Sequence, residues 1–111
     1  MQINKIVKSQ TLTIELIGRL DAVTSLELDE ALKNSLEDIE ELDFEMSKLD
    51  YIASAGLRIL LKYQKMIDKS KKKMTLKNLK PEVREVLDMT GFSDFLNIID
   101  VNPVKKLSIE F

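Results

Sequence analysis

The sequence predicts a single α/β domain whose mixed sheet has four to five strands and carries its helices mainly on one face. The chain has 111 residues, which is the size of one ordinary domain. Its strand-like and helix-like segments follow the order β-β-α-β-α-β-α. The strand-like segments alternate apolar and polar residues, whereas strands covered on both faces would be continuously apolar. One face of the sheet is therefore expected to meet solvent.

The strands are predicted from this alternation. Residues 11–17 (TLTIELI) alternate strictly and indicate a half-buried strand. Residues 3–7 (INKIV) form a weaker strand, and residues 8–10 (KSQ) could join the two as a hairpin. Residues 41–46 (ELDFEM) and 73–79 (KMTLKNL) repeat the pattern, with Leu42, Phe44, Met46, Met74 and Leu76 pointing inward.

Two helices are predicted between these strands, each from a capping residue and an apolar repeat. Thr24 can cap a helix in which Leu28, Leu32 and Leu36 recur every four residues. Ser54 can cap a second helix that runs to about Lys69 and carries a wide apolar stripe.

The last part of the chain contains a third helical pattern. Pro81 suits its first turn, Val83, Val86 and Leu87 point inward, and Gly91 closes it. We expect a short fourth helix at residues 93–96 and an edge strand at residues 105–111.

Composition excludes several classes of protein. With 44% hydrophobic and 32% charged residues, the chain is expected to be a soluble globular protein. A net charge of −2 argues against a strong global attraction to nucleic acid or to an anionic membrane. No apolar run is long enough to span a bilayer, and the first residues lack the apolar core of a secretion signal. We therefore expect a cytoplasmic protein without nucleic-acid or membrane partners.

The residue types that are missing exclude most catalytic sites. Without cysteine or histidine, a Ser-His-Asp triad, a cysteine nucleophile and a Cys/His zinc site are impossible. The three glycines, Gly18, Gly56 and Gly91, have spacings that build neither a Walker loop nor a GxGxxG turn. We expect no catalytic residue, no cofactor, no metal and no enzymatic activity of this chain's own. Chemistry at Ser54 would then be performed by another protein.

Three motifs, in this order and spacing, resemble the STAS domain of anti-sigma factor antagonists. They are G-x-L-D at Gly18–Asp21, Y-I-x-S-x-G-L-R at Tyr51–Arg58, and V-L-x-M-T-G-F at Val86–Phe92. The resemblance covers nearly the whole chain and implies one STAS domain over residues 1–111.

The resemblance also implies a mechanism. In this family the unphosphorylated antagonist binds an anti-sigma factor that is a serine kinase, and so frees the sigma factor. The kinase phosphorylates a serine that precedes x-G-L, here Ser54, and the complex dissociates; a PP2C-type phosphatase resets the switch. The strand-end aspartate beside this serine corresponds to Asp21. Many members have Asp directly before the serine, where this chain has Ala53, a change that bears on the choice of kinase.

Each of these residues also has a purely structural interpretation. Ser54 could be only a helix cap, although a cap hydroxyl at a loop–helix junction is also reachable by a kinase. Gly56 could allow close packing of the first turn or close approach of a partner's backbone. Asp21 could cap a turn or border Ser54. Leu26 lies off the Leu28 stripe, so an exposed Leu26 near Ser54 would mark an interface.

Basic residues line one face of the second predicted helix. A solvated face is the favoured interpretation and partner docking the sharper one, while nucleic acid is not expected because aromatic residues are only 5% of the chain. The predicted phosphorylation site is Ser54, and a monomer or weak dimer is expected. The residues predicted to bind the partner are Asp21, Thr24, Leu26, Ala53, Ser54, Ala55, Gly56 and Arg58.

Two other functions compete with this one. The chain could be a STAS adaptor subunit that is never phosphorylated, in a transporter or a stress assembly. It could also be a receiver domain phosphorylated on aspartate, but Asp21 and Asp50 alone are too few for the acidic cluster that such a domain needs.

Overall fold

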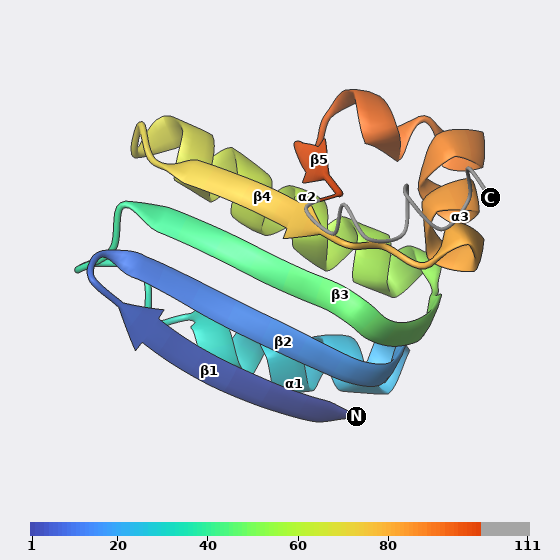
Figure 1. Ribbon diagram of the computed structural model, residues 1–111, viewed down its shortest axis with the longest axis horizontal. Coiled ribbons are helices and arrows are strands. Elements are labelled where there is room, and N and C mark those ends of the chain that lie inside the picture. The colour runs from blue at the N-terminus through green and yellow to red at the C-terminus, as the bar shows by residue number, and fades with distance from the viewer. Residues whose placement is uncertain (101–111) are drawn as a thin grey trace, which may run out of the picture.

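The computed structural model describes residues 1–100 of the chain and contains one five-stranded sheet, in the order β1-β2-β3-β4-β5 (Figure 1). β1 pairs antiparallel with β2, and the other neighbours are parallel. The strands are β1 Gln2–Lys8, β2 Thr11–Leu20, β3 Glu41–Ile52, β4 Lys73–Lys77 and β5 Ile98–Ile99. The helices are α1 Ala22–Leu32, α2 Ser54–Lys69, α3 Pro81–Thr90 and the 3₁₀ turn η1 Phe92–Asp94.

The predicted fold class is confirmed. α1 lies behind β2, α2 lies beside it behind β3 and β4, and α3 lies beyond the end of β4 (Figure 1). The alternating residues of β2, β3 and β4 point towards the helices as expected. The inward residues that the alternation predicts are all nearly inaccessible: Leu12, Ile14, Leu16, Leu42, Phe44, Met46, Met74 and Leu76. Their burial supplies the main stabilising free energy of the domain.

The other face of the sheet carries polar side chains in matching positions. Asp43 on β3 forms an ion pair with Lys77 on β4, with 2.8 Å between carboxylate oxygen and Nζ. The Asn97 side-chain amide donates to the hydroxyl of Thr75 at 3.1 Å. These pairings satisfy polar groups at the middle of the sheet, where both Asp43 and Thr75 are buried.

The strand bounds differ from the prediction: β1 is one residue longer at each end, β4 ends at Lys77 instead of Leu79, and β2 and β3 are extended furthest. β2 continues from Ile17 to Leu20, and β3 continues from Met46 to Ile52. The β2–β3 register shifts between Glu15 and Ile17 and again between Gly18 and Arg19, which interrupts the period-two pattern. Gly18 has a φ of +111°, a conformation that favours glycine. Because the register is irregular there, a search for strict alternation does not find the last residues of β2 and β3.

Both predicted helix caps on the first two helices are wrong by one to three residues. Asp21, not Thr24, is the N-cap of α1, and Thr24 is the third residue of the helix. Ala53, not Ser54, is the N-cap of α2, and Ser54 is the first helical residue. Leu36 lies beyond the end of α1, partly buried against the core.

The C-terminal elements agree in part with the sequence. α3 begins at Pro81 and is closed by Gly91 in the left-handed conformation, with φ +79°. The short helix expected at residues 93–96 is a 3₁₀ turn that begins one residue earlier, and β5 was not predicted. The edge strand predicted at residues 105–111 lies outside the described residues. Within residues 1–100, no helix is long and apolar enough to cross a membrane.

Candidate functional site

The start of α2 presents Ser54 to solvent. β3 ends at Ile52, and the backbone N–H of Ala53 donates to the carbonyl of Leu20 at 2.9 Å. The N–H of Leu57 then donates to the carbonyl of Ala53 at 3.1 Å and closes the first turn. Ser54 is exposed, and no side chain caps this helix. The first N–H groups of any helix have no intrahelical acceptor, and those of α2 also have no side-chain cap.

The start of α1 is closed by its own side chains. The Asp21 carboxylate accepts from the backbone N–H groups of Val23 at 3.1 Å and Thr24 at 3.0 Å. In return, the N–H of Asp21 donates to the Thr24 hydroxyl at 2.8 Å, which completes a capping box. The hydrogen bonds from the Thr24 N–H and hydroxyl lower the pKa of Asp21 below its usual value. The carboxylate is thus occupied within its own helix.

Strand pairing brings these two helix starts together. Leu20 and Ile52 are partners on adjacent parallel strands, so Asp21 and Ala53 follow at the same edge of the sheet. Gly56 tightens the junction, because a Cβ at this position would come within 2.8 Å of Leu20 Cγ and 2.9 Å of Ile52 Cγ1. Close packing against the sheet explains this glycine. A contact between Gly56 and a partner stays a prediction.

An ion pair and a hydrogen bond set the register between α1 and α2. The Asp29 carboxylate accepts from Lys62 Nζ at 3.0 Å and from the hydroxyl of Tyr63. The Tyr63 hydroxyl and the Lys62 ammonium lower the pKa of Asp29. Burial, followed by the hydrogen bond to Asp29, raises the pKa of Tyr63. The two helices are joined at mid-length, with Asp29 opposite Lys62 and Tyr63.

Exposed apolar residues lie on the first two turns of α1. Leu26 is 71% exposed, in agreement with its position off the buried stripe, and Val23 is 70% exposed. Residues three apart share a helix face, so the two form one apolar patch on α1, whose start lies beside the start of α2. Val23 was missed, although its spacing from Leu26 was a usable signal. The role of this patch in binding stays a prediction.

A stacked pair on the neighbouring strand ends was also missed. The Arg19 guanidinium lies 4.2 Å from the centre of the Tyr51 ring, and both side chains are exposed. Arg19 and Tyr51 are register partners at the ends of β2 and β3. Their contact depends on the shifted register, so the sequence carried no signal for it.

The structure places most of the predicted partner-binding residues at one edge of the sheet. These are Asp21, Thr24, Ala53, Ser54, Ala55 and Gly56, and Leu26 and Arg58 lie one turn further along their helices.

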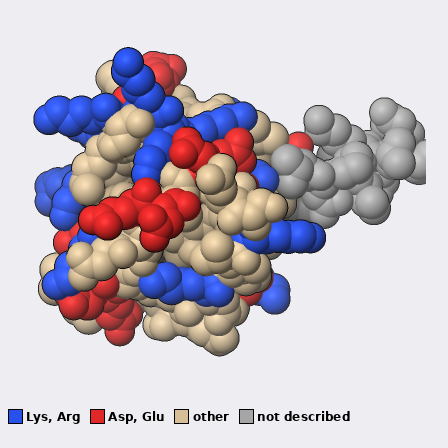
Figure 2. Space-filling view, turned by 90° about the vertical axis from the view of Figure 1, so that its left-hand side faces the viewer, with Lys and Arg blue, Asp and Glu red and all other residues tan. Residues whose placement is uncertain are grey.

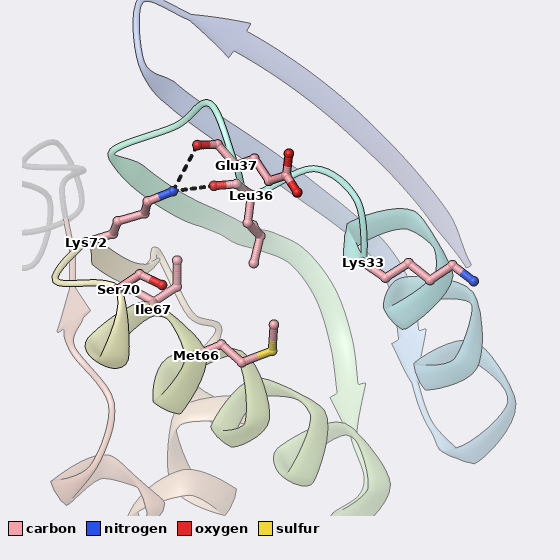
Figure 3. A pocket seen from close by; sticks show the side chains of 7 residues that line it. All are labelled: Lys33, Leu36, Glu37, Met66, Ile67, Ser70 and Lys72. Carbon is pink, nitrogen blue, oxygen red and sulfur yellow. Dashed lines mark hydrogen bonds between the residues drawn. The ribbon is translucent and has the colours of Figure 1, made fainter.

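A hollow of about 270 Å³ lies at the opposite end of α2, between the ends of α1 and α2 (Figure 3). Met66 and Ile67 line it, and the Lys72 ammonium donates to the carbonyls of Leu36 and Glu37. The end-on view of this side shows Lys and Arg side chains intermingled with Asp and Glu (Figure 2).

Within residues 1–100, no group of three or more His, Cys, Asp or Glu residues could hold a metal ion.

Comparison with known proteins matches this chain to one family along almost its whole length. The family model described as the STAS domain matches residues 2–103. The anti-sigma F factor antagonist of Paenibacillus polymyxa is 29% identical over 104 residues, which cover 88% of this chain and 87% of that protein. BtrV of Bordetella bronchiseptica is 44% identical over 48 residues, and this match spans only 43% of this chain and 41% of BtrV.

Solved structures share the fold at low sequence identity. The anti-sigma factor antagonist SpoIIAA in its unphosphorylated form superposes with a TM-score of 0.79 at 17% identity, covering 96% of this chain and 93% of that one. The phosphorylated Bacillus SpoIIAA gives 0.73 at 16% identity, covering 99% and 100%. A sulfate transporter family protein from Wolinella succinogenes gives 0.74 at 18% identity, covering 96% and 93%.

Proposed function

Because this chain belongs to the STAS domain family, we propose that it acts as an anti-sigma factor antagonist whose binding is switched by phosphorylation of Ser54. Unphosphorylated, it binds an anti-sigma factor that is a serine kinase, and so releases the sigma factor. The kinase phosphorylates Ser54 and the complex dissociates. A PP2C-type phosphatase removes the phosphate. The relative from Paenibacillus polymyxa, an anti-sigma F factor antagonist, supports this proposal.

The observation that carries the proposal is the position of Ser54. Its side chain is exposed on the first residue of α2, and no side-chain cap occupies the helix start. A kinase can therefore reach the hydroxyl without opening the fold. The neighbouring apolar patch of Val23 and Leu26 offers the exposed contact area that a binding partner would cover.

The modification is a phosphoryl transfer in which this chain is the substrate. The Ser54 oxygen forms a bond to the γ-phosphorus of ATP, and the bond from that phosphorus to the β–γ bridging oxygen breaks, releasing ADP. The hydroxyl proton passes to a base of the kinase. The neighbouring carboxylate of this chain, Asp21, is occupied in capping α1, so we assign that base to the partner. In the reset reaction, a water oxygen forms a bond to the same phosphorus and the bond from phosphorus to the Ser54 oxygen breaks. The Ser54 oxygen takes up a proton, which restores the hydroxyl, and inorganic phosphate is released.

The modification would change the surface and keep the fold. A phosphoserine carries about −1.5 to −2 charges at pH 7. At the first position of a helix, the unpaired N–H groups and the helix dipole accommodate negative charge. SpoIIAA has been solved in unphosphorylated and phosphorylated forms, and the fold of this chain matches both. The partner would meet a dianion where it had met a small neutral hydroxyl.

Binding of Ser54 variants to a purified anti-sigma factor kinase from the same organism tests the proposal. Ser54→Ala should bind and stay bound in the presence of ATP, because it cannot be phosphorylated. Ser54→Asp should bind more weakly by roughly a hundredfold, since an unmatched charge in an interface costs several kcal/mol. Ser70→Asp, which makes the same change at the other end of α2, should bind normally. Equal affinities for all three variants would contradict the proposal.

An adaptor without phosphorylation is the alternative. The shared fold of the Wolinella succinogenes sulfate transporter family protein supports it, because that fold also occurs in a transporter family. An adaptor should bind its partner equally well with Ser54→Ala and Ser54→Asp. The same pair of variants therefore separates the two functions.

A further inference from the structure

The exposed face of α2 carries four cations at different distances from Ser54. They are Arg58, Lys62, Lys65 and Lys69, and all four side chains are exposed. Lys62 is held by Asp29 of α1, at 3.0 Å. Among residues 1–100, no ion pair or hydrogen bond engages the side chain of Arg58. Arg58 is thus a free cation one helical turn from Ser54.

Helix geometry directs Arg58 towards Ser54. Residues four apart are neighbours on a helix surface, with about 5–6 Å between their Cβ atoms. Long side chains on a helix lean towards its N-terminus and cover the preceding turn. The turn before Arg58 begins at Ser54. A guanidinium that follows this geometry reaches the position that a Ser54 phosphate would occupy.

We propose that Arg58 is the intramolecular partner of the Ser54 phosphate, an inference that rests on the proposed function of Ser54. The planar guanidinium can donate two N–H groups to two phosphate oxygens, which gives strong charge-assisted hydrogen bonds. Lys62 is unsuited to this role because it lies two turns away and is paired with Asp29. Arg58 therefore gains a partner when Ser54 is phosphorylated.

This pairing gives one modification two effects on the binding surface. Phosphorylation adds a dianion at Ser54, and it also engages the cation that the unphosphorylated protein offers to its partner. A partner carboxylate that contacts Arg58 would then meet a neutralised guanidinium beside a negative charge. The off state is stabilised within the chain itself, before any partner approaches.

The pair is tested by a ³¹P NMR titration of protein with phosphoserine inserted at position 54 during translation. This route needs no kinase, so its result is independent of whether Ser54 is phosphorylated in cells. An adjacent guanidinium favours the dianion and lowers the second pKa of the phosphate, which is about 6 in phosphoserine. Arg58→Gln should raise that pKa by roughly 0.3 unit relative to the parent protein. Arg58→Lys, which keeps the charge and loses the fork of donors, should fall between them.

Lys65→Gln is the matched control. Lys65 lies eleven residues after Ser54 on the same exposed face, about 16 Å along the helix, which exceeds the Debye length at physiological ionic strength. Its loss should leave the phosphate pKa unchanged. Equal phosphate pKa values in the parent and in Arg58→Gln would overturn the pairing. So would an equal rise in Lys65→Gln, because the effect would then be one of net charge. Circular dichroism of the unphosphorylated variants verifies that each is folded.

Discussion

The two helix starts at the edge of the sheet differ in one respect: α1 is capped and α2 is open. At α1, Asp21 and Thr24 satisfy each other's backbone N–H groups. At α2, the cap position holds Ala53, which has no side-chain acceptor, and the next residue is an exposed serine. Both starts follow register partners on β2 and β3, so they lie at the same edge of the sheet.

The difference separates a structural helix start from one that is available for binding. The capping box satisfies the first turn of α1, the helix that carries the exposed Val23 and Leu26. The open start leaves N–H groups and a hydroxyl that an added phosphate could use. The start of α1 is thus closed by its own side chains, whereas the start of α2 is open to modification. Substitutions at the two starts should therefore have different effects on stability.

The largest effect is expected from Gly56→Val, which would force the open start away from the sheet. The new side chain would overlap Leu20 and Ile52, so the free energy of unfolding should fall by about 2 kcal/mol. Ala55→Val is the control, since Ala55 is partly exposed and loses only helix propensity, less than about 0.7 kcal/mol. Urea titration measures both. Equal stabilities for the two variants would contradict the packing of this turn against β2.

Asp21→Ala should open the closed start and lower the melting temperature by a few degrees, because two backbone N–H groups lose their acceptor. Asp21→Asn keeps an acceptor and should melt close to the parent. Ser54→Ala should leave the melting temperature unchanged, because Ser54 is not the cap. A loss at Ser54→Ala as large as that at Asp21→Ala would show that the serine caps α2 after all.

Ala53→Asp should close the open start. Aspartate is among the best N-cap residues, and replacing alanine should raise the free energy of unfolding by about 1 kcal/mol. Ala53→Val, which adds no acceptor and is as poor an N-cap residue as alanine, should give no such gain. Thermal melts of the parent and both variants, measured in parallel, test this prediction. If aspartate does not raise the stability, the N–H groups of α2 already have partners.

The smallest effect concerns acid stability. Hydrogen bonds lower the pKa of Asp29 in the folded protein, so below the ordinary value of 3.8 the unfolded chain binds more protons than the folded one. Stability contributed by Asp29 is present above that value and is lost as the pH falls through the lower, folded value. Asp29→Asn should therefore flatten the acid side of the stability profile. Glu27→Gln, an exposed carboxylate on the same helix, is the control, and an identical flattening there would contradict the assignment.

Much of this fold could be predicted because its strands alternate cleanly. Burial of Leu12, Ile14, Leu42 and Phe44 follows directly from a period of two. The ends of β2 and β3 could not be predicted, because shifts in register break the period just before the site. That failure displaced the predicted start of α1 to Thr24, since the extension of β2 to Leu20 makes Asp21 the first residue free to cap it.

The candidate site was predicted unevenly. The exposure of Leu26 followed from its place off the helix stripe, and the position of Ser54 followed from the family motif. Aspartate, serine and threonine are all good caps, so residue type alone could not choose among Asp21, Thr24 and Ser54. The contact between Arg19 and Tyr51 requires the cross-strand register, which local sequence does not contain.

Mass spectrometry of the protein isolated from its own cells, during growth and under stress, tests directly whether Ser54 is a regulated phosphorylation site. Trypsin should release the peptide from Leu49 to Arg58, LDYIASAGLR, in which Ser54 is the only serine. If phosphorylation of Ser54 switches binding, this peptide should carry a phosphate on Ser54 whose occupancy changes between the two conditions. A peptide that carries no phosphate on Ser54 in either condition would contradict it and favour the adaptor.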